Sequence, residues 1–120
     1  MIPRDRVATL EHQLAPRTIR DALGISRERM ARLLDVSTRT VERWEERADL
    51  PANSVSRTHL ATLHEIVELG TIVYGLETLR RYLSLPMPGF GGRTPLAMIE
   101  QGEADRVYGA VAADYEGQGF

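Results

Sequence analysis

The residues best suited to a binding role lie between positions 37 and 43, where the sequence is STRTVER. Arginine carries a planar fork of donors that fits O6 and N7 of guanine or the oxygens of a phosphate, and hydroxyl groups donate to phosphates. The candidate nucleic-acid contacts are Ser37, Thr38, Arg39, Thr40, Glu42 and Arg43. We expect Arg39 and Arg43 to contact bases or phosphates. An ordinary solvated helix would carry similar residues, so the interpretation depends on the surrounding elements.

Those elements form a helix, a tight turn and a second helix. Apolar residues recur at spacings of three and four on both sides of the turn, at Met30, Leu33, Leu34, Val41 and Trp44. Asp35 stands where the chain must adopt a left-handed conformation, which aspartate tolerates. Ser37 can cap the second helix, and Ala31 is small enough for two helices to cross closely. The spacing of Trp44 from Val41 places its side chain in the core. The pattern predicts a helix-turn-helix of the lambda-repressor and Cro type.

Two alternative sites receive little support from the spacing of their residues. The segment HEIVE, from His64 to Glu68, places a histidine and a glutamate within one helical turn, but His12 and His59 lie on other faces or segments. The segment GFGGRT near residue 90 lacks the lysine of a Walker loop and the strand that precedes either nucleotide-binding motif. We therefore expect no metal and no cofactor, and we expect Phe90 and Arg93 to be exposed and to contact a partner.

The composition predicts a soluble, cytoplasmic, non-enzymatic protein. The chain of 120 residues has 42% hydrophobic content, which suits one small domain or two subdomains. It contains no cysteine and no lysine, which removes disulfides, thiolate nucleophiles and Schiff-base chemistry. No segment resembles a signal peptide or a membrane span.

Charge is divided unevenly along the chain. Residues 1–47 hold ten arginines against eight acids, a net charge of +2, whereas residues 48–120 hold five arginines against nine acids, a net charge of −4. The slight basic excess predicts weak DNA binding by one copy, so we expect a dimer or a larger assembly on an operator. The acidic half suits a protein partner better than phosphate.

The hydrophobic periodicity predicts an all-α chain in four parts. Residues 1–16 form an N-terminal arm, 17–53 the helix-turn-helix DNA-binding domain, 54–74 a connecting spine helix, and 75–120 a C-terminal domain with a flexible tail. Gly70 within the spine predicts a closely crossing helix, because glycine weakens a helix interior. Thr94 should cap a helix that begins with Pro95, and the last helix should bury Val107 and Val111.

The C-terminal part resembles a known family. The segment PMPGFGGRTPLAMIEQGEADRVYGAV, from Pro86 to Val111, is similar to the toxin-binding domain of Xre/MbcA/ParS-type antitoxins, and the helix-turn-helix is similar to their Xre-like half. The matching positions are Gly91, Gly92, Arg93, Pro95, Leu96, Gly102 and Val107. The chain departs from the family at Asp35, where glycine is usual, and at Glu103 and Ala104, where many members have a second glycine.

The resemblance implies a type II antitoxin that neutralises a RES-domain toxin acting on NAD, by occluding its active site, and that represses their shared operon. It implies a homodimer or a larger hetero-oligomer with the toxin, and operator DNA as a second partner. The candidate toxin contacts are Phe90, Arg93, Tyr115, Gln118 and Phe120. A stand-alone transcriptional repressor would share every feature of residues 17–53 and remains the alternative.

Overall fold

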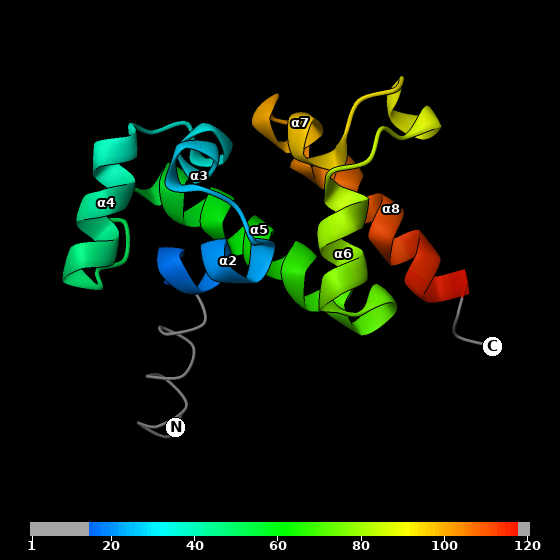
Figure 1. The fold of residues 1–120 in the computed structure, drawn as a ribbon, viewed down its shortest axis with the longest axis horizontal. Coiled ribbons are helices and arrows are strands. Elements are labelled where there is room, and N and C mark those ends of the chain that lie inside the picture. The colour runs from blue at the N-terminus through cyan, green and yellow to red at the C-terminus, as the bar shows by residue number, and fades with distance from the viewer. Residues whose placement is uncertain (1–14, 118–120) are drawn as a thin grey trace. The chain divides into compact units, whose positions relative to one another are not determined.

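The computed structural model describes residues 15–117, and every regular element within that range is helical. The elements are α2 (Pro16–Leu23), α3 (Arg27–Leu34), α4 (Thr38–Arg47), α5 (Ser54–Tyr74), α6 (Leu76–Leu83), the 3-10 turn η1 (Pro88–Phe90), α7 (Pro95–Glu100) and α8 (Ala104–Gly117) (Figure 1). The predicted all-α class is confirmed. No helix of the described part is both long and apolar enough to cross a membrane.

The chain divides into two compact units, Met1–His64 and Glu65–Phe120, which we call unit 1 and unit 2. The long helix α5 contributes its first part to unit 1 and its second part to unit 2. In unit 1, α4 packs against both α2 and α3. The buried side chains there are Ile19, Leu23, Met30, Ala31, Leu33, Leu34, Val41, Trp44, Leu60 and Leu63. This core confirms the two helical stripes on either side of the turn and the buried position of Trp44.

The turn between α3 and α4 has the local geometry that the sequence predicts. Asp35 adopts a left-handed conformation, with φ 55° and ψ 49°. The Val36 amide then donates to the Ala31 carbonyl at 3.0 Å, which closes the end of α3. Ser37 caps the start of α4, because its hydroxyl oxygen accepts from the Thr40 amide at 3.1 Å. Asp35 therefore does here what glycine does in most turns of this kind.

Helix α5 begins at Ser54 although its apolar stripe begins only at Leu60. The side chain of Asn53 is the reason. Its Oδ1 accepts from the amides of Val55 at 2.7 Å and Ser56 at 3.2 Å. Two free amide donors of the first turn are therefore satisfied by the side chain that precedes the helix.

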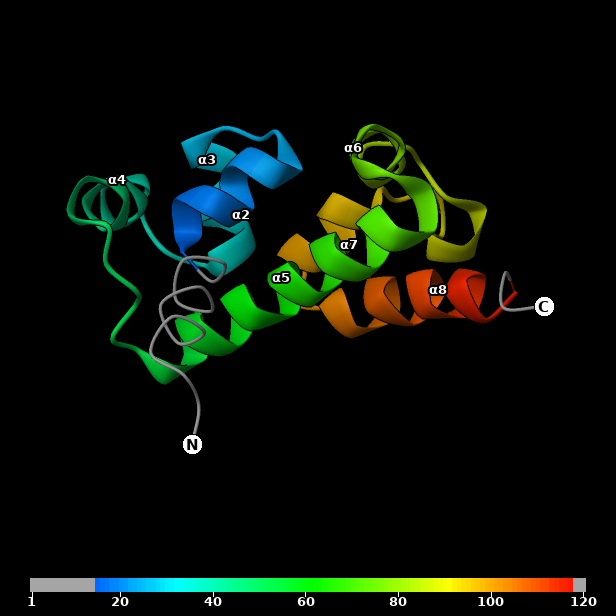
Figure 2. The ribbon, with the colours of Figure 1, turned by 90° about the horizontal axis from the view of Figure 1, so that it is seen from below.

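Unit 2 is built around α7, which packs against both α6 and α8 (Figure 2). Its buried side chains are Ile66, Leu79, Leu83, Phe90, Leu96, Met98, Ile99, Val107 and Val111. The close helix crossing predicted at Gly70 is confirmed, because a Cβ atom there would lie 2.5 Å from Cδ1 of Leu79 on α6. Thr94 caps α7 by accepting from the Ala97 amide at 3.0 Å, as predicted.

Candidate functional site

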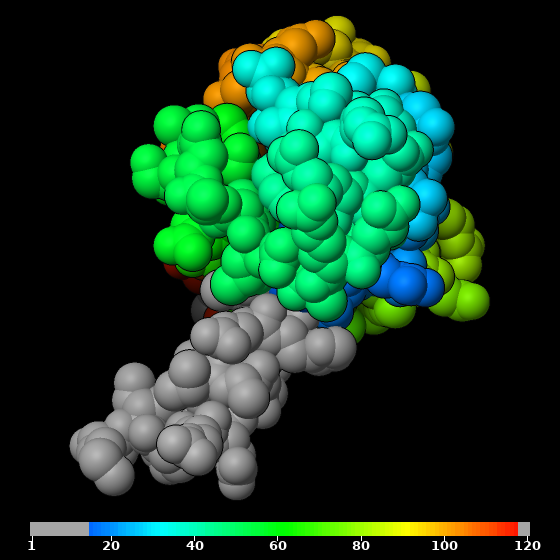
Figure 3. Space-filling model, turned by 90° about the vertical axis from the view of Figure 1, so that its left-hand side faces the viewer, coloured from blue at the N-terminus to red at the C-terminus, as the bar shows by residue number. Residues whose placement is uncertain are grey.

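The outer side of α4 is the first candidate site, and Figure 3 looks directly onto this helix (Figure 3). Arg39 and Arg43 are exposed and lie one turn apart, so their guanidinium groups share one side of the helix. Neither makes a hydrogen bond or ion pair with any residue of the described range 15–117. Their donors are thus available to an anionic partner. Thr38 and Glu42 are half-buried beside them.

Ser37 and Thr40 have an additional structural role at the start of α4. Ser37 Oγ accepts from the Thr40 amide, and it also lies 2.8 Å from Thr40 Oγ1, so the two hydroxyls share a hydrogen bond. Each hydroxyl therefore has an intramolecular partner before any ligand arrives. The residues expected to contact DNA are brought to one end of one helix, and their contact with DNA remains a prediction.

Two arginines and a glutamate hold α4 in place. Arg20 on α2 donates from Nε to Glu45 Oε2 and from Nη2 to Glu45 Oε1, both at 2.8 Å. Arg27 on α3 lies 3.3 Å from the same carboxylate. The Glu45 side chain is only 2% exposed. One carboxylate therefore joins α2, α3 and α4.

This arrangement shifts the pKa values of both main partners. Burial alone would raise the pKa of Glu45, but hydrogen bonds and charge from Arg20, with Arg27 adding to them, outweigh burial and lower it. The hydrogen bonds to Glu45 raise the pKa of Arg20. The sequence analysis missed this pair. The available signal was the position of Glu45 one turn after the buried Val41, where a charge requires a partner.

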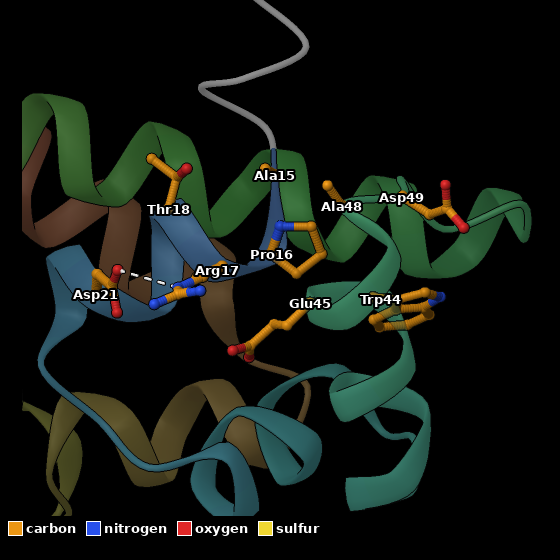
Figure 4. A pocket seen from close by; sticks show the side chains of 9 residues that line it. All are labelled: Ala15, Pro16, Arg17, Thr18, Asp21, Trp44, Glu45, Ala48 and Asp49. Carbon is orange, nitrogen blue, oxygen red and sulfur yellow. Dashed lines mark ion pairs between the residues drawn. The ribbon is translucent and has the colours of Figure 1, made fainter.

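A pocket of about 430 Å³ lies where the start of α2 meets the end of α4 (Figure 4). Its walls are Ala15, Pro16, Arg17, Thr18, Asp21, Trp44, Glu45, Ala48 and Asp49. Arg17 lies 3.9 Å from Asp21, and Glu45 is bound by Arg20 and Arg27. The lining contains three carboxylates, from Asp21, Glu45 and Asp49.

The second candidate site is the loop between α6 and α7 in unit 2. The prediction that Phe90 is exposed is wrong, since its side chain is 7% exposed and belongs to the core of unit 2. The physical reason is that η1 folds the loop back on itself. The amides of Phe90 and Gly92 both donate to the Met87 carbonyl at 3.0 Å, and the Met87 amide donates to the Arg93 carbonyl at 3.0 Å.

Arg93 is half-buried and is engaged within its own unit. Its Nε donates to the Phe90 carbonyl at 3.0 Å, and its Nη1 donates to Glu103 Oε2 at 2.8 Å and to Gln101 Oε1. The guanidinium therefore ties the loop to the residues that join α7 and α8. This role differs from the exposed partner contact that we expected from the sequence.

Arg106 completes the network from α8. It lies 3.1 Å from Glu103 Oε1, and its guanidinium carbon lies 5.9 Å from the centre of the Phe90 ring, within cation–π range. Hydrogen bonds from Arg93 and then from Arg106 lower the pKa of Glu103. We call Arg93, Glu103 and Arg106 the loop clasp. Sequence reasoning missed the pairing of Arg93 with Glu103, because these two residues lie ten positions apart in the chain.

The predicted contact Tyr115 is 51% exposed on α8, whereas Gln118 and Phe120 lie outside the described residues. Next to Tyr115, Asp114 accepts a hydrogen bond from the Tyr74 hydroxyl of α5. The Tyr74 ring lies 5.3 Å from that of Tyr82. Burial and then the hydrogen bond to Asp114 raise the pKa of Tyr74. Within residues 15–117 there is no cluster of three metal-ligating side chains.

The comparisons with known proteins find a likeness to a solved structure. No protein-family model matches the sequence, and no curated protein matches it. Among solved structures, the chain is similar to a chain of the crystal structure of the M.tuberculosis MbcT-MbcA toxin-antitoxin complex. The TM-score is 0.71 with 21% sequence identity, and the match covers 92% of this chain and 97% of that chain. At this identity the likeness shows a shared all-α fold.

Proposed function

We propose that this chain is the antitoxin of a type II toxin–antitoxin pair. In this proposal it binds and neutralises a partner toxin and represses its own operon by binding operator DNA. The observation that carries the proposal is the fold likeness to a chain of a toxin–antitoxin complex, because it extends over 92% of the sequence and so includes both units. The sequence pattern around Gly91 and Arg93 supports the same assignment independently.

The DNA-binding role is assigned to residues 17–53. Two observations support it. The left-handed conformation of Asp35 makes the tight turn between α3 and α4 that a helix-turn-helix requires. Arg39 and Arg43 are exposed on α4 without a partner in the described chain. Because unit 1 has little basic excess, we propose that two copies bind one operator. The other proposed DNA contacts are Ser37, Thr38, Thr40 and Glu42.

The toxin-binding role is assigned to residues 75–120, joined to the DNA-binding part by the spine helix of residues 54–74. We propose a RES-domain toxin that consumes NAD, whose active site the antitoxin occludes. Tyr115 is exposed and suits a direct contact, as do Gln118 and Phe120 in the tail. Phe90 and Arg93 act instead by holding the conformation of the loop between α6 and α7. Neutralisation by occlusion requires no catalytic residue and no cofactor.

The test is to induce the neighbouring reading frame alone and then together with this chain, while growth and cellular NAD are measured. Growth arrest with falling NAD that co-expression relieves would support the proposal. If the neighbouring gene product arrests growth and co-expression of this chain does not restore growth, the proposal is contradicted. A neighbouring gene product that is harmless would also contradict it. If growth is arrested and co-expression restores it while cellular NAD stays unchanged, the antitoxin role is supported, but the toxin does not consume NAD.

A stand-alone repressor is the second candidate function, favoured by the unpartnered arginines of α4. It predicts high-affinity operator binding by the chain alone. It also predicts that adding the neighbouring gene product leaves the midpoint of that binding curve unchanged, whereas the antitoxin proposal predicts a shift.

A further inference from the structure

The pocket between the start of α2 and the end of α4, which we call the α2–α4 pocket, has the size of a small-molecule site. Its volume is about 430 Å³, and such sites occupy roughly 300 to 1,000 Å³. All of its lining residues belong to unit 1. Its apolar surface consists of the buried Pro16, the Trp44 ring and the methyl groups of Ala15 and Ala48 (Figure 4). The apolar body of a ligand would be removed from water on this surface.

The charges around the pocket leave one carboxylate without a partner. The Asp21 carboxylate lies 3.9 Å from Nε of Arg17, and the Glu45 carboxylate is bound by the two arginines described above. The carboxylate of Asp49 makes no hydrogen bond or ion pair with any residue between 15 and 117. Figure 4 shows Asp49 and Trp44 on one side of the pocket. An acid next to an aromatic ring suits a positive group that is attached to an apolar body.

Ala48 adopts a backbone conformation that glycine adopts at lower cost. Its φ is 51° and its ψ is 37°, in the left-handed region where a Cβ atom is unfavourable. The end of α4 requires this conformation, because the amides of Ala48 and Asp49 donate to the carbonyls of Glu45 at 3.4 Å and Trp44 at 3.0 Å. The Ala48 methyl group adds nothing to these hydrogen bonds. It does line the pocket, so a ligand gives it a function.

We propose that the α2–α4 pocket binds a small organic cation that carries one amine or guanidinium group on an apolar body. The body contacts Pro16, Trp44 and Ala48, and the positive group donates to the Asp49 carboxylate. A ligand that contacts both α2 and α4 stabilises one position of α4 relative to α2. The cation therefore regulates operator binding, and this regulatory part of the inference rests on the proposed function.

Anionic and neutral ligands match the charges of the pocket less well. An anion would meet three carboxylates in the lining against the single guanidinium of Arg17. A neutral ligand would leave Asp49 without a charged partner. We therefore expect the pocket to select an organic cation over neutral and anionic molecules of the same shape.

Trp44 is the only tryptophan in the sequence, so its fluorescence reports directly on the pocket that it lines. The experiment titrates the purified full-length chain at neutral pH with phenylbutylamine and follows the Trp44 emission. We expect a saturable change and a dissociation constant at least roughly tenfold lower than for phenylbutanol or phenylbutyrate, because both analogues lack the charged donor. Equal affinity for phenylbutanol would overturn the assignment of a cation.

The role of Asp49 is tested by removing its charge at nearly constant size. Asp49→Asn should weaken the binding of phenylbutylamine by at least roughly tenfold and leave the binding of phenylbutanol unchanged. The matched control is Asp35→Asn, because Asp35 is also exposed and left-handed at the end of a helix of unit 1, but does not line the pocket. We expect the control to bind phenylbutylamine with the affinity of the wild type. Equal affinities of the two variants would overturn the role of Asp49.

Ala48→Gly should change affinity and stability in opposite directions. The loss of one methyl contact should weaken the binding of phenylbutylamine roughly threefold. The unfolding temperature should rise, because glycine adopts the left-handed conformation without the unfavourable Cβ atom. A lower affinity in a more stable chain cannot result from unfolding. An unchanged affinity would overturn the contact between the ligand and the Ala48 methyl group.

Regulation is tested by fluorescence anisotropy with the DNA upstream of the gene, in the presence of saturating phenylbutylamine. The midpoint of operator binding should shift for the wild type. It should not shift for Asp49→Asn at the same amine concentration, which controls for ionic strength. Binding of the amine without any shift in the wild type would keep the ligand site and overturn its regulatory role.

The outcomes separate this inference from the proposed function. If the wild-type chain does not bind the upstream DNA, the proposed DNA-binding function fails, while the fluorescence titration still tests the ligand site. If neither Trp44 emission nor titration calorimetry shows binding of phenylbutylamine, the pocket does not bind this class of ligand and the inference is wrong.

Discussion

Arg20 and Glu45 form a two-point ion pair that joins α2 to α4, with both N···O distances at 2.8 Å. The pair lies behind the exposed side of α4, and the Glu45 side chain is 2% exposed. A planar guanidinium that meets a carboxylate at two points fixes relative orientation as well as distance. The position of the proposed DNA-binding helix therefore depends on a contact outside its own exposed surface.

Arg20→Ala should lower the free energy of unfolding by about 3 kcal/mol, because it leaves a buried carboxylate with only the longer contact to Arg27. Urea unfolding followed by circular dichroism measures the change. The matched control is Arg17→Ala, since Arg17 lies beside Asp21 with both side chains more than half exposed, and its loss should cost about 0.5 kcal/mol or less. Equal effects of the two variants would contradict the structural importance of the Arg20–Glu45 pair.

The same pair predicts a pH dependence of stability. The folded pKa of Glu45 lies below its usual value, so the unfolded chain takes up a proton at this site before the folded chain does. The contribution of the pair is therefore present above the ordinary glutamate pKa and is lost as the pH falls through the folded pKa. The difference in unfolding free energy between the wild type and Glu45→Gln should be largest near pH 7 and shrink toward pH 3. A difference that grows on acidification would reverse the assigned sign.

Arg39→Ala and Arg43→Ala should each weaken operator binding while changing stability by no more than about 0.5 kcal/mol, because both side chains are exposed and unpaired within residues 15–117. Fluorescence anisotropy with the DNA upstream of the gene provides the measurement. A phosphate contact should reduce the salt slope by about one, whereas a base contact should relax sequence selectivity. Arg81→Ala in unit 2 is the control. Full affinity in both α4 variants would remove the DNA-binding assignment of these residues.

The features predicted correctly from the sequence depend on neighbours a few residues apart. Asp35, Ser37 and Thr94 set local backbone conformation or cap a helix, and each interaction spans three or four residues. Two features were not predicted correctly, namely the burial of Phe90 and the Arg20–Glu45 pair. These features depend on contacts between segments up to 25 residues apart in the chain. Hydrophobic periodicity carries no information about which distant charges meet, so this part required the structure.

Gly70→Ala and Gly109→Ala should change stability in opposite directions. At Gly70 the new Cβ atom would lie 2.5 Å from Leu79, so overpacking should outweigh the gain in helix propensity and cost about 1 to 3 kcal/mol. At Gly109 the Cβ atom meets open space, so the variant should gain up to about 1 kcal/mol. Thermal unfolding of the two variants compares them directly. Stabilisation by Gly70→Ala would show that α5 and α6 do not cross closely in solution.

The contacts of the loop clasp predict that Arg93 stabilises the loop between α6 and α7 even when no partner is bound. Arg93→Ala removes the donors to Phe90, Gln101 and Glu103, so the hydrogen-bonded amides of Met87, Phe90 and Gly92 should exchange with solvent faster.

Hydrogen–deuterium exchange of the free chain measures this effect without any toxin. Arg81→Ala serves as the control, because Arg81 is exposed on α6 and its side chain makes no hydrogen bond or ion pair within the described residues. The folded pKa of Glu103 lies below its usual value, so its carboxylate stays ionised at mildly acidic pH. The wild-type loop should therefore stay protected from exchange at mildly acidic pH and lose this protection as Glu103 becomes protonated. If Arg93→Ala leaves exchange unchanged in the free chain and weakens toxin binding alone, Arg93 is a direct contact and the clasp has no positioning role.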